Sequence, residues 1–277
     1  VADGIGEAAV RMALTAWTQG RDETDLSAAL ASAAQTLAAG GIVPFPTETV
    51  YGLGANAVDA AAVARVFEAK NRPSFDPLIV HVHTVGQAAA CTAAFPATAQ
   101  ALADAFWPGP LTLVLPKAAA IPDLVTSGLP TVGVRMPNHP VALELIRQAG
   151  VPLAAPSANP FGALSPTRAE HVRRQLGGQV DAVLDGGACA VGVESTIVSL
   201  VDERPVLLRP GGIPADALEH VVGRLDRPRS SPAKPAAPGQ LPSHYAPQTP
   251  LFAAAQVQAP AGDRLGPGGH VLYSTID

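Results

Sequence analysis

Leu78-Ile79-Val80-His81-Val82 is the stretch that decides the fold, because four of its five residues are apolar and follow one another almost without interruption. A strand with this pattern belongs in a sheet that is covered on both faces. On either side of it, helix-like and strand-like patterns alternate throughout residues 27–222. The sequence therefore predicts one α/β domain over this range.

The other elements are predicted from hydrophobic periodicity and from capping and turn residues. Asp25-Leu26-Ser27 caps an Ala-rich helix, and Gly40-Gly41 closes it. Strands are expected at residues 42–46, 111–115, 131–135, 152–155, 181–184, 195–201 and 205–209, and helices at 27–39, 60–70, 98–106, 139–149 and 167–176.

Composition excludes several classes of protein. The 277 residues are 48% hydrophobic and 15% charged, which excludes a wholly disordered chain. The 18 Lys and Arg residues are outnumbered by 23 Asp and Glu, so the net charge is −5. The protein as a whole therefore does not attract nucleic acid. An anionic ligand must then be held by a local cluster of cations. No run of 18 apolar residues is present, so no membrane span is expected.

The ends of the chain differ from its middle. We expect an N-terminal helical extension over residues 1–26, the α/β domain over 27–226 and a Pro-, Ala- and Ser-rich linker over 227–249. Residues 250–277 contain one predicted strand and are too few to bury a core of their own. The start shows no signal-peptide pattern, and Cys91 and Cys189 lack CxxC spacing, so a reducing cytoplasm is expected.

Polar clusters recur where the predicted strands end, and α/β proteins place their ligand sites at such positions. None of them matches a P-loop, a dinucleotide-binding GxGxxG, a metalloprotease HExxH or a GxSxG elbow. The clusters are PTETVYGLG (46–54), KNRPSFDPL (70–78), FWPGPLT (106–112), VRMP (134–137), APSAN (155–159), SPT (165–167), EST (194–196) and RPGG (209–212).

Taken singly, each cluster has an ordinary structural interpretation. A proline-rich stretch is usually a rigid turn. Arg135 can be a rim ion pair of little energetic value. His81 inside an apolar strand is more often a core histidine than a catalyst, and neither Ser157 nor Ser195 has the neighbours of a triad nucleophile. Only their joint occurrence at strand ends favours a ligand site.

In this order the motifs closely resemble the YrdC-like family of threonylcarbamoyl-AMP synthases, over roughly residues 27–225. The segment Pro238-Gly239 and His244-Tyr245-Ala246-Pro247 resembles the linker of the family's long form, in which a small Rossmann-like domain follows. The resemblance implies a twisted mixed sheet flanked by helices, with an open concave ligand site and an extended linker behind it. Residues 250–277 would be the start of the second domain.

The resemblance implies the formation of threonylcarbamoyl-AMP and pyrophosphate from L-threonine, bicarbonate and ATP, for the modification of adenosine 37 in tRNAs. Neither step needs an enzyme nucleophile, so catalysis is by positioning and electrostatics. Lys70, Arg72 and Arg135 would supply the positioning charges. Threonine would be bound by Thr49, His81, Arg135, Ala155 and Ser195, and ATP by Lys70, Arg72, Asp76, Thr131, Ser157, Asn159, Ser165, Arg209, His244 and Tyr245.

The residue types suit those roles. Lys70 and Arg72 end a helix beside Pro73, and Arg209 precedes glycines that let backbone approach a phosphate. Arg135 at a strand end suits bidentate capture of a carboxylate. His81 either hydrogen-bonds the substrate or helps to remove the ammonium proton, and the sequence leaves both open. His244 and Tyr245 are expected to fold over the site as a lid.

Mg²⁺ is expected to arrive with ATP, held by phosphates and water and by no protein ligand. The expected partners are the substrates, a downstream tRNA threonylcarbamoyl transferase and, through it, tRNA, with no membrane. One alternative is an RNA-binding module of the same fold without synthase activity. The net charge, the 4% of aromatic residues and the lack of a Lys/Arg run weigh against it. A second alternative is a related enzyme that makes carbamoyl-adenylate for hydrogenase maturation. Such enzymes are much longer and carry cysteine-rich zinc modules, which this sequence lacks.

Overall fold

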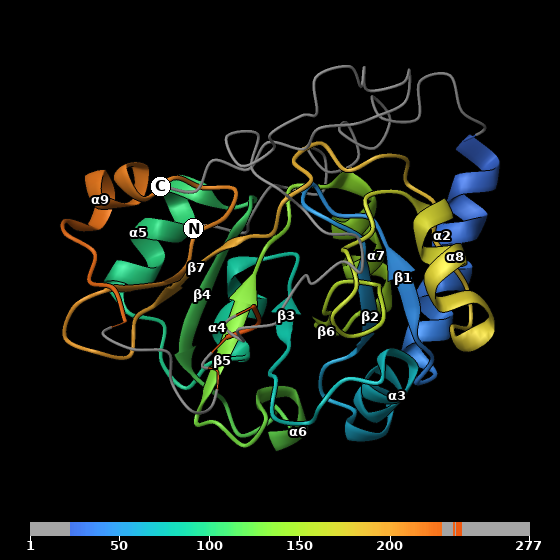
Figure 1. The fold of residues 1–277 in the computed structure, drawn as a ribbon, viewed down its shortest axis with the longest axis horizontal. Helices are drawn as coiled ribbons and strands as arrows, with labels where there is room; N and C mark the ends of the chain where they lie inside the picture. The colour runs from blue at the N-terminus through green and yellow to red at the C-terminus, as the bar shows by residue number, and fades with distance from the viewer. Residues whose placement is uncertain (1–22, 229–234, 236, 240–277) are drawn as a thin grey trace, which may run out of the picture.

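The computed structural model describes residues 23–228, 235 and 237–239. Their strands form one mixed sheet in the order β1-β2-β6-β3-β5-β4-β7-β8. This confirms the predicted α/β class with a mixed sheet and flanking helices (Figure 1). The strands are β1 (Val43–Phe45), β2 (Gly52–Asn56), β3 (Ile79–His81), β4 (Leu111–Pro116), β5 (Thr131–Arg135), β6 (Leu153–Ala154), β7 (Thr196–Ser199) and β8 (Val206–Arg209).

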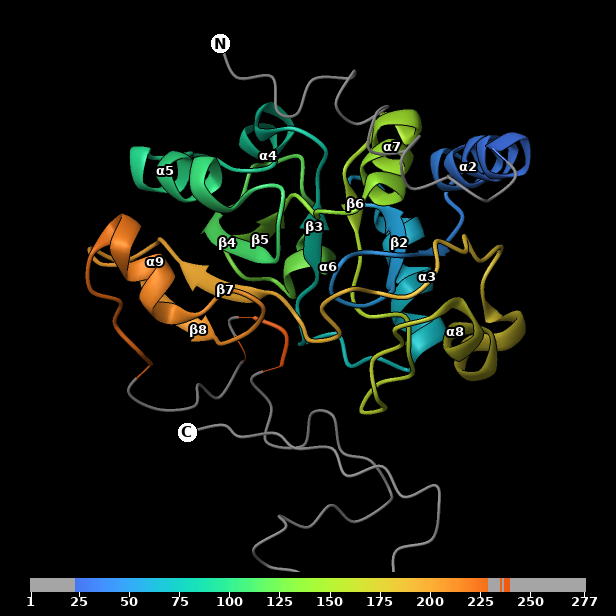
Figure 2. The same ribbon diagram turned by 90° about the horizontal axis from the view of Figure 1, so that it is seen from above.

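Helices cover the sheet on both sides. Figure 2 shows α2, α4, α5 and α7 along one side, α8 on the opposite side and α9 beside α5 at the β8 edge. The helices are α2 (Glu23–Ala38), α3 (Ala60–Lys70), α4 (Val85–Ala90), α5 (Ala97–Phe106), α6 (Asp123–Thr126), α7 (Pro140–Ala149), α8 (Ala169–Leu176) and α9 (Ala215–Val222), with a 3₁₀ turn over Gly177–Gln179.

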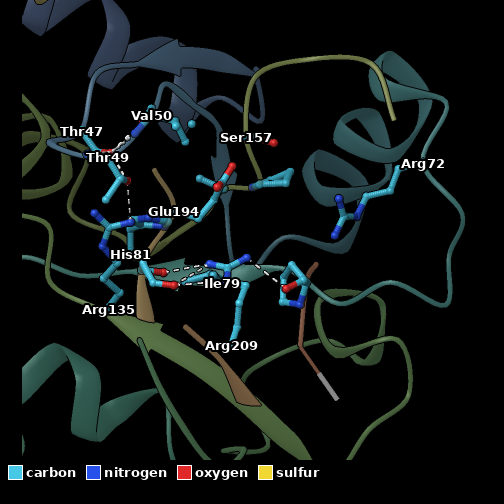
Figure 3. A pocket seen from close by; sticks show the side chains of 15 residues that line it. Thr47, Thr49, Val50, Arg72, Ile79, His81, Arg135, Ser157, Glu194 and Arg209 are labelled. Carbon is cyan, nitrogen blue, oxygen red and sulfur yellow. Dashed lines mark hydrogen bonds between the residues drawn. The ribbon is translucent and has the colours of Figure 1, made fainter. Parts of the chain in front are cut away.

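Local sequence explains where the best-predicted helix begins and ends. The Asp59 carboxylate accepts hydrogen bonds from the backbone N–H groups of Ala61 and Ala62, which caps the first turn of α3. At the other end Asn71 adopts φ 50°, a left-handed conformation that terminates the helix. This ending turns the chain sharply, so Arg72 leaves the helix axis and points toward the sheet (Figure 3).

The strands at the centre of the sheet carry the core. Every residue of β3 is buried, as are the first five of β4, which agrees with the prediction that the sheet is covered on both faces. β3 pairs in parallel with β5 and antiparallel with β6. A second cluster of apolar side chains lies where α2 packs against α7, and it includes Leu30, Leu37, Val141, Leu145 and Ile146.

One expected strand is absent, and one strand was not expected. Residues 181–184 form no strand, although the Asp181 and Leu184 N–H groups donate to the carbonyls of Ile42 and Pro44. Pro44 has no N–H to return a bond, so no ladder develops. β2 was not predicted, because glycines at both 52 and 54 make its sequence unlike a strand. A Cβ at Gly54 would lie 2.8 Å from a ring atom of Phe45, so the β1–β2 pair needs glycine at this position.

The described part of the chain contains no helix long and apolar enough to cross a membrane. The expected N-terminal helix and the residues His244 and Tyr245 lie outside the described residues.

Candidate substrate-binding site

A cavity lies where β3 and β5 end and the loop 46–51 crosses them (Figure 3). We call it the strand-end cavity. Three arginines from separate elements surround it, and Glu194 is the one acidic side chain among the described residues that line it. The lining residues are Thr47, Thr49, Val50, Gly52, Arg72, Ile79, His81, Arg135, Ala155, Pro156, Ser157, Glu194, Ser195, Arg209 and Pro238.

Strand register places His81 beside Arg135. The two residues are Cα partners in the parallel β3–β5 pair, and each is the last residue of its strand. The carboxyl ends of neighbouring parallel strands are the usual ligand-binding edge of an α/β sheet. The sheet topology therefore brings together two residues that are 54 positions apart in the sequence.

Arg135 is held on three sides. Its Nη2 lies 2.6 Å from Oε1 of Glu48, its Nη1 donates to Oγ1 of Thr49 at 3.0 Å, and its Nε donates to the carbonyl of Gly109 at 3.4 Å. Arg135 and Glu48 are 4% and 6% exposed. A guanidinium fixed in this way has little rotational freedom left to lose when a carboxylate binds it.

His81 is neutral in this setting. Burial, together with the nearby charge of Arg135, lowers its pKa to about 3. Its ring meets the ring of Phe45 edge-on, with 6.0 Å between the centroids. Because the imidazole is neutral at physiological pH, it is suited to a hydrogen-bonding role and not to a charged one.

Arg72 folds back on its own turn. Nη2 of Arg72 lies 2.8 Å from Oδ2 of Asp76 and donates to the carbonyl of Pro77, and Nε of Arg72 donates to the carbonyl of Asp76. Burial raises the pKa of Asp76, whereas the charges of Arg72, Lys70 and Arg209 lower it. Asp76 is fully buried, so it acts on the cavity through Arg72.

Lys70 lies beneath the cavity and does not line it. Its Nζ donates to the backbone carbonyls of Ser157 and Asn159, and the side chain is 1% exposed. Burial and the neighbouring charge of Arg72 lower the pKa of Lys70. The two donations of Lys70 fix the loop that presents Ser157.

Arg209 joins the β7 end to the C-terminal segment. It donates to the carbonyl and hydroxyl oxygens of Ser195 and, at 3.0 Å, to the carbonyl of Pro238. The Ser195 hydroxyl lies 2.8 Å from that of Thr112. Ala237 is buried against Ile79, Val114 and Ile197 on the face of the sheet. The segment 237–239 therefore closes one side of the site.

The predicted site residues are distributed over three places. Thr49, His81, Arg135, Ala155 and Ser195, predicted for threonine, all line the strand-end cavity, as do Arg72, Ser157 and Arg209, predicted for ATP. Lys70, Asp76 and Asn159 support its walls, and Thr131 lines a small neighbouring cavity together with Ala237 and Pro238. The Ser165 hydroxyl donates to Oε1 of Glu194 at 2.6 Å. The binding roles of these residues stay predictions.

Sequence reasoning assigned no role to four groups that the structure places at the site. Thr47 and Glu48 belong to the quoted PTET segment, and Glu194 opens the EST motif, so the signal lay in their motifs. Nothing in the sequence indicates that Glu48 would meet Arg135, because the contact spans 87 residues. Pro238 stands in the quoted linker segment, but nothing in the sequence indicates that its carbonyl would accept from Arg209.

Comparison with known proteins accounts for this arrangement. Residues 35–211 match the Sua5, YciO and YrdC family, described as telomere recombination, and residues 213–266 match a family described as threonylcarbamoyl-AMP synthase, C-terminal domain. A threonylcarbamoyl-AMP synthase of Bacillus subtilis is 51% identical over 226 residues, covering 80% of this chain and 65% of the relative. One of Pyrococcus abyssi is 50% identical over 215 residues, covering 75% and 62%. The chain thus spans less than two thirds of the length of these curated relatives.

Solved structures agree with the sequence matches. The crystal structure of P. abyssi Sua5 complexed with L-threonine has a TM-score of 0.78 and 47% identity, covering 80% of this chain and 66% of that one. Escherichia coli YciO, 22% identical with a TM-score of 0.62, shares the fold. The family match covers more than half of the chain, and the cavity is built from the family's motifs. The chain belongs to the Sua5, YciO and YrdC family.

Proposed function

We propose that this chain is an L-threonylcarbamoyladenylate synthase, a nucleotidyltransferase that converts L-threonine, bicarbonate and ATP to threonylcarbamoyl-AMP and pyrophosphate. One observation carries the proposal: all five residues predicted for threonine, Arg135 among them, line one cavity together with two further arginines, Arg72 and Arg209. The complex of P. abyssi Sua5 with L-threonine supports it, since that protein is 47% identical to this chain.

The proposed chemistry needs charge placement more than acid–base groups. The threonine amine loses a proton and bonds to the carbon of bicarbonate, which releases water and leaves a carbamate. A carbamate oxygen then attacks the α-phosphorus of ATP, and pyrophosphate leaves. Carboxylate, carbamate and triphosphate repel one another, so fixed cations lower the barrier by holding them together.

The three arginines divide this task by their position. Arg135 would take the threonine carboxylate, because it is fixed at the strand ends beside His81 and Thr49. Arg72 and Arg209 would hold the phosphates. Ser157 would also contact ATP, from a loop that Lys70 and Asn159 support. Thr131, Ser165, His244 and Tyr245 complete the proposed nucleotide site. Mg²⁺ would enter bound to ATP.

The product is a labile mixed anhydride, so an acceptor must consume it promptly. We propose a tRNA threonylcarbamoyl transferase as that partner, with tRNA as the final acceptor at adenosine 37. Cys91 and Cys189 are free thiols, which supports a reducing cytoplasm as the compartment. Residues 27–226 would form the catalytic domain, 227–249 the linker and 250–277 the start of the C-terminal domain, after the extension 1–26.

Pyrophosphate release from ATP, bicarbonate and Mg²⁺ tests the proposal, with L-threonine present, absent or replaced by L-serine. Release that depends on threonine and bicarbonate is expected. Release without threonine would identify an ATPase or a synthase for another carbamate. The absence of release by a folded sample that binds tRNA would favour an RNA-binding module of the same fold.

A further inference from the structure

A chain of three hydrogen bonds runs from Arg135 through Thr49 and Thr47 to the carbonyl of Val50 in the loop 46–51. Nη1 of Arg135 donates to Oγ1 of Thr49 at 3.0 Å, Oγ1 of Thr49 lies 2.9 Å from Oγ1 of Thr47, and Oγ1 of Thr47 donates to the carbonyl of Val50 at 2.6 Å. Thr47 and Thr49 are both buried and both line the strand-end cavity.

The direction of every proton in this chain is fixed by its two ends. A guanidinium can only donate and a carbonyl can only accept. The contact between Thr47 and Val50 therefore uses the one hydroxyl proton of Thr47. The contact between the two threonines must then use the hydroxyl proton of Thr49. The N–H groups of Thr49 and Val50 also point at Oγ1 of Thr47, at the longer distances of 3.2 and 3.3 Å, so they share one of its two lone pairs while the hydroxyl of Thr49, at 2.9 Å, takes the other.

The hydroxyl of Thr49 consequently has no proton left for a ligand. It accepts from Arg135, donates to Thr47 and keeps one lone pair. Any cavity ligand that contacts it must donate a hydrogen bond. We propose that Thr47 is a positioning residue that makes Thr49 an obligatory acceptor, so that the site selects an amino acid by an ammonium or hydroxyl donor at this point.

This inference rests on the proposed function for the identity of the ligand, and it orients that ligand. A carboxylate has only acceptor oxygens, so it cannot bond to Thr49 and is left to Arg135. The donor end of threonine, either its ammonium or its β-hydroxyl, then faces Thr49. Thr47 exerts this selection without contacting the donor itself.

A double-mutant cycle on L-threonine affinity, measured by calorimetric titration of the full chain, tests the role of Thr47. T47V keeps the shape and removes the hydroxyl, and we expect about a tenfold loss of affinity, the equivalent of one hydrogen bond. T47S keeps the hydroxyl and should bind within about twofold to threefold of the original chain. In a T49V background, T47V should cause no further loss, because Thr47 acts through Thr49.

A purely structural role gives a different result. If T47V only loosens the turn, its effect will multiply with that of T49V, and ATP affinity will fall as well. Either result overturns the proposal, and so does unchanged threonine affinity in T47V. Titration with L-2-aminobutyrate separates the two donors: the T47V effect disappears with this ligand if the β-hydroxyl is the donor and persists if the ammonium is.

The proton direction is also measurable without a substitution. Neutron diffraction from deuterated crystals of the unaltered chain locates the hydroxyl deuteron of Thr49, and we expect it on the line from Oγ1 of Thr49 to Oγ1 of Thr47. A deuteron directed at bound threonine overturns the inference even if T47V fails to fold. If the unaltered chain does not bind threonine at all, the proposed function fails, whereas the proton direction is still decided by this measurement.

Discussion

The Nη2 atom of Arg135 lies 2.6 Å from Oε1 of Glu48, and both side chains are almost fully buried. Removing one charge of such a pair leaves the other buried and uncompensated. We expect E48Q to lower the free energy of unfolding by about 3–5 kcal/mol. Urea denaturation at pH 7.5 measures this.

The ion pair of Lys117 with Asp123 provides the control. Its N–O distance is 2.9 Å, but the aspartate side chain is 82% exposed. D123N should cost no more than about 1 kcal/mol. If both variants lose the same small amount, the buried pair does not stabilise the fold in the way described.

Arg135 should matter for one substrate and not for the other. R135A removes the guanidinium that faces the proposed carboxylate position, while Arg72 and Arg209 remain. We expect threonine affinity to fall at least about a hundredfold, as for the loss of a charge-assisted bidentate contact, with ATP affinity within about threefold. Calorimetric titration of each ligand measures this, and an equal loss for both in a folded variant contradicts the assignment.

His81 should make the protein less stable in acid. Its pKa is about 3 in the folded state and about 6.5 when exposed, so between these values the unfolded state binds the additional proton. Stability then falls as the pH falls from about 6.5 toward 3, by about 1.4 kcal/mol for each pH unit. At pH 4.5 this contribution is about 2–3 kcal/mol relative to pH 7.5.

H81Q removes the titrating group. Urea denaturation of H81Q between pH 7.5 and 4.5 should therefore show a shallower decline in stability than the unaltered chain. Parallel declines would mean that His81 titrates alike in both states.

Gly211 should tolerate no side chain. A Cβ there would lie 2.4 Å from the carbonyl oxygen of Glu194 and 2.5 Å from the carbonyl carbon of Ser195, both backbone atoms that cannot turn aside. G211A is expected to cost about 1–3 kcal/mol and to weaken threonine binding through the displaced Ser195. G178A, where a Cβ meets nothing within 4 Å, is the control and should match the unaltered chain in melting temperature and affinity.

The linker segment 236–247 should affect turnover more than folding. Among its described residues, Ala237 packs on the sheet, and the carbonyl of Pro238 accepts from Arg209. Deletion of residues 236–247 should lower pyrophosphate release at least about tenfold, since it opens the site to water, while unfolding changes by about 1 kcal/mol. Normal turnover by the shortened chain would exclude a closing role.

The sequence predicts well where local signals agree. The helix over residues 60–70 was predicted with both ends correct, because Asp59 caps it and Asn71 ends it in a left-handed conformation. The strand over 131–135 was predicted with equal success. β2 was missed because the ring of Phe45 requires glycine at position 54, and no local pattern contains this contact.

The candidate site shows the same difference between local signals and long-range contacts. Most residues that line the cavity stand in the quoted motifs, at the ends of predicted strands and helices, so the sequence could find them. The pairing of Arg135 with Glu48 and the proton chain through Thr47 depend on how the loop 46–51 crosses the sheet. Long-range placement of this kind follows from packing, and packing is not written in any one segment.

The close approach of Gly54 to Phe45 couples the sizes of the side chains that these two positions can accept. The ring of Phe45 occupies the space that a side chain at 54 would need, and the same ring meets His81 edge-on. A larger residue at 54 is therefore compatible only with a smaller one at 45. Across homologous chains these two positions should co-vary, and lineages that exchanged the pair should also differ in how the cavity histidine is held.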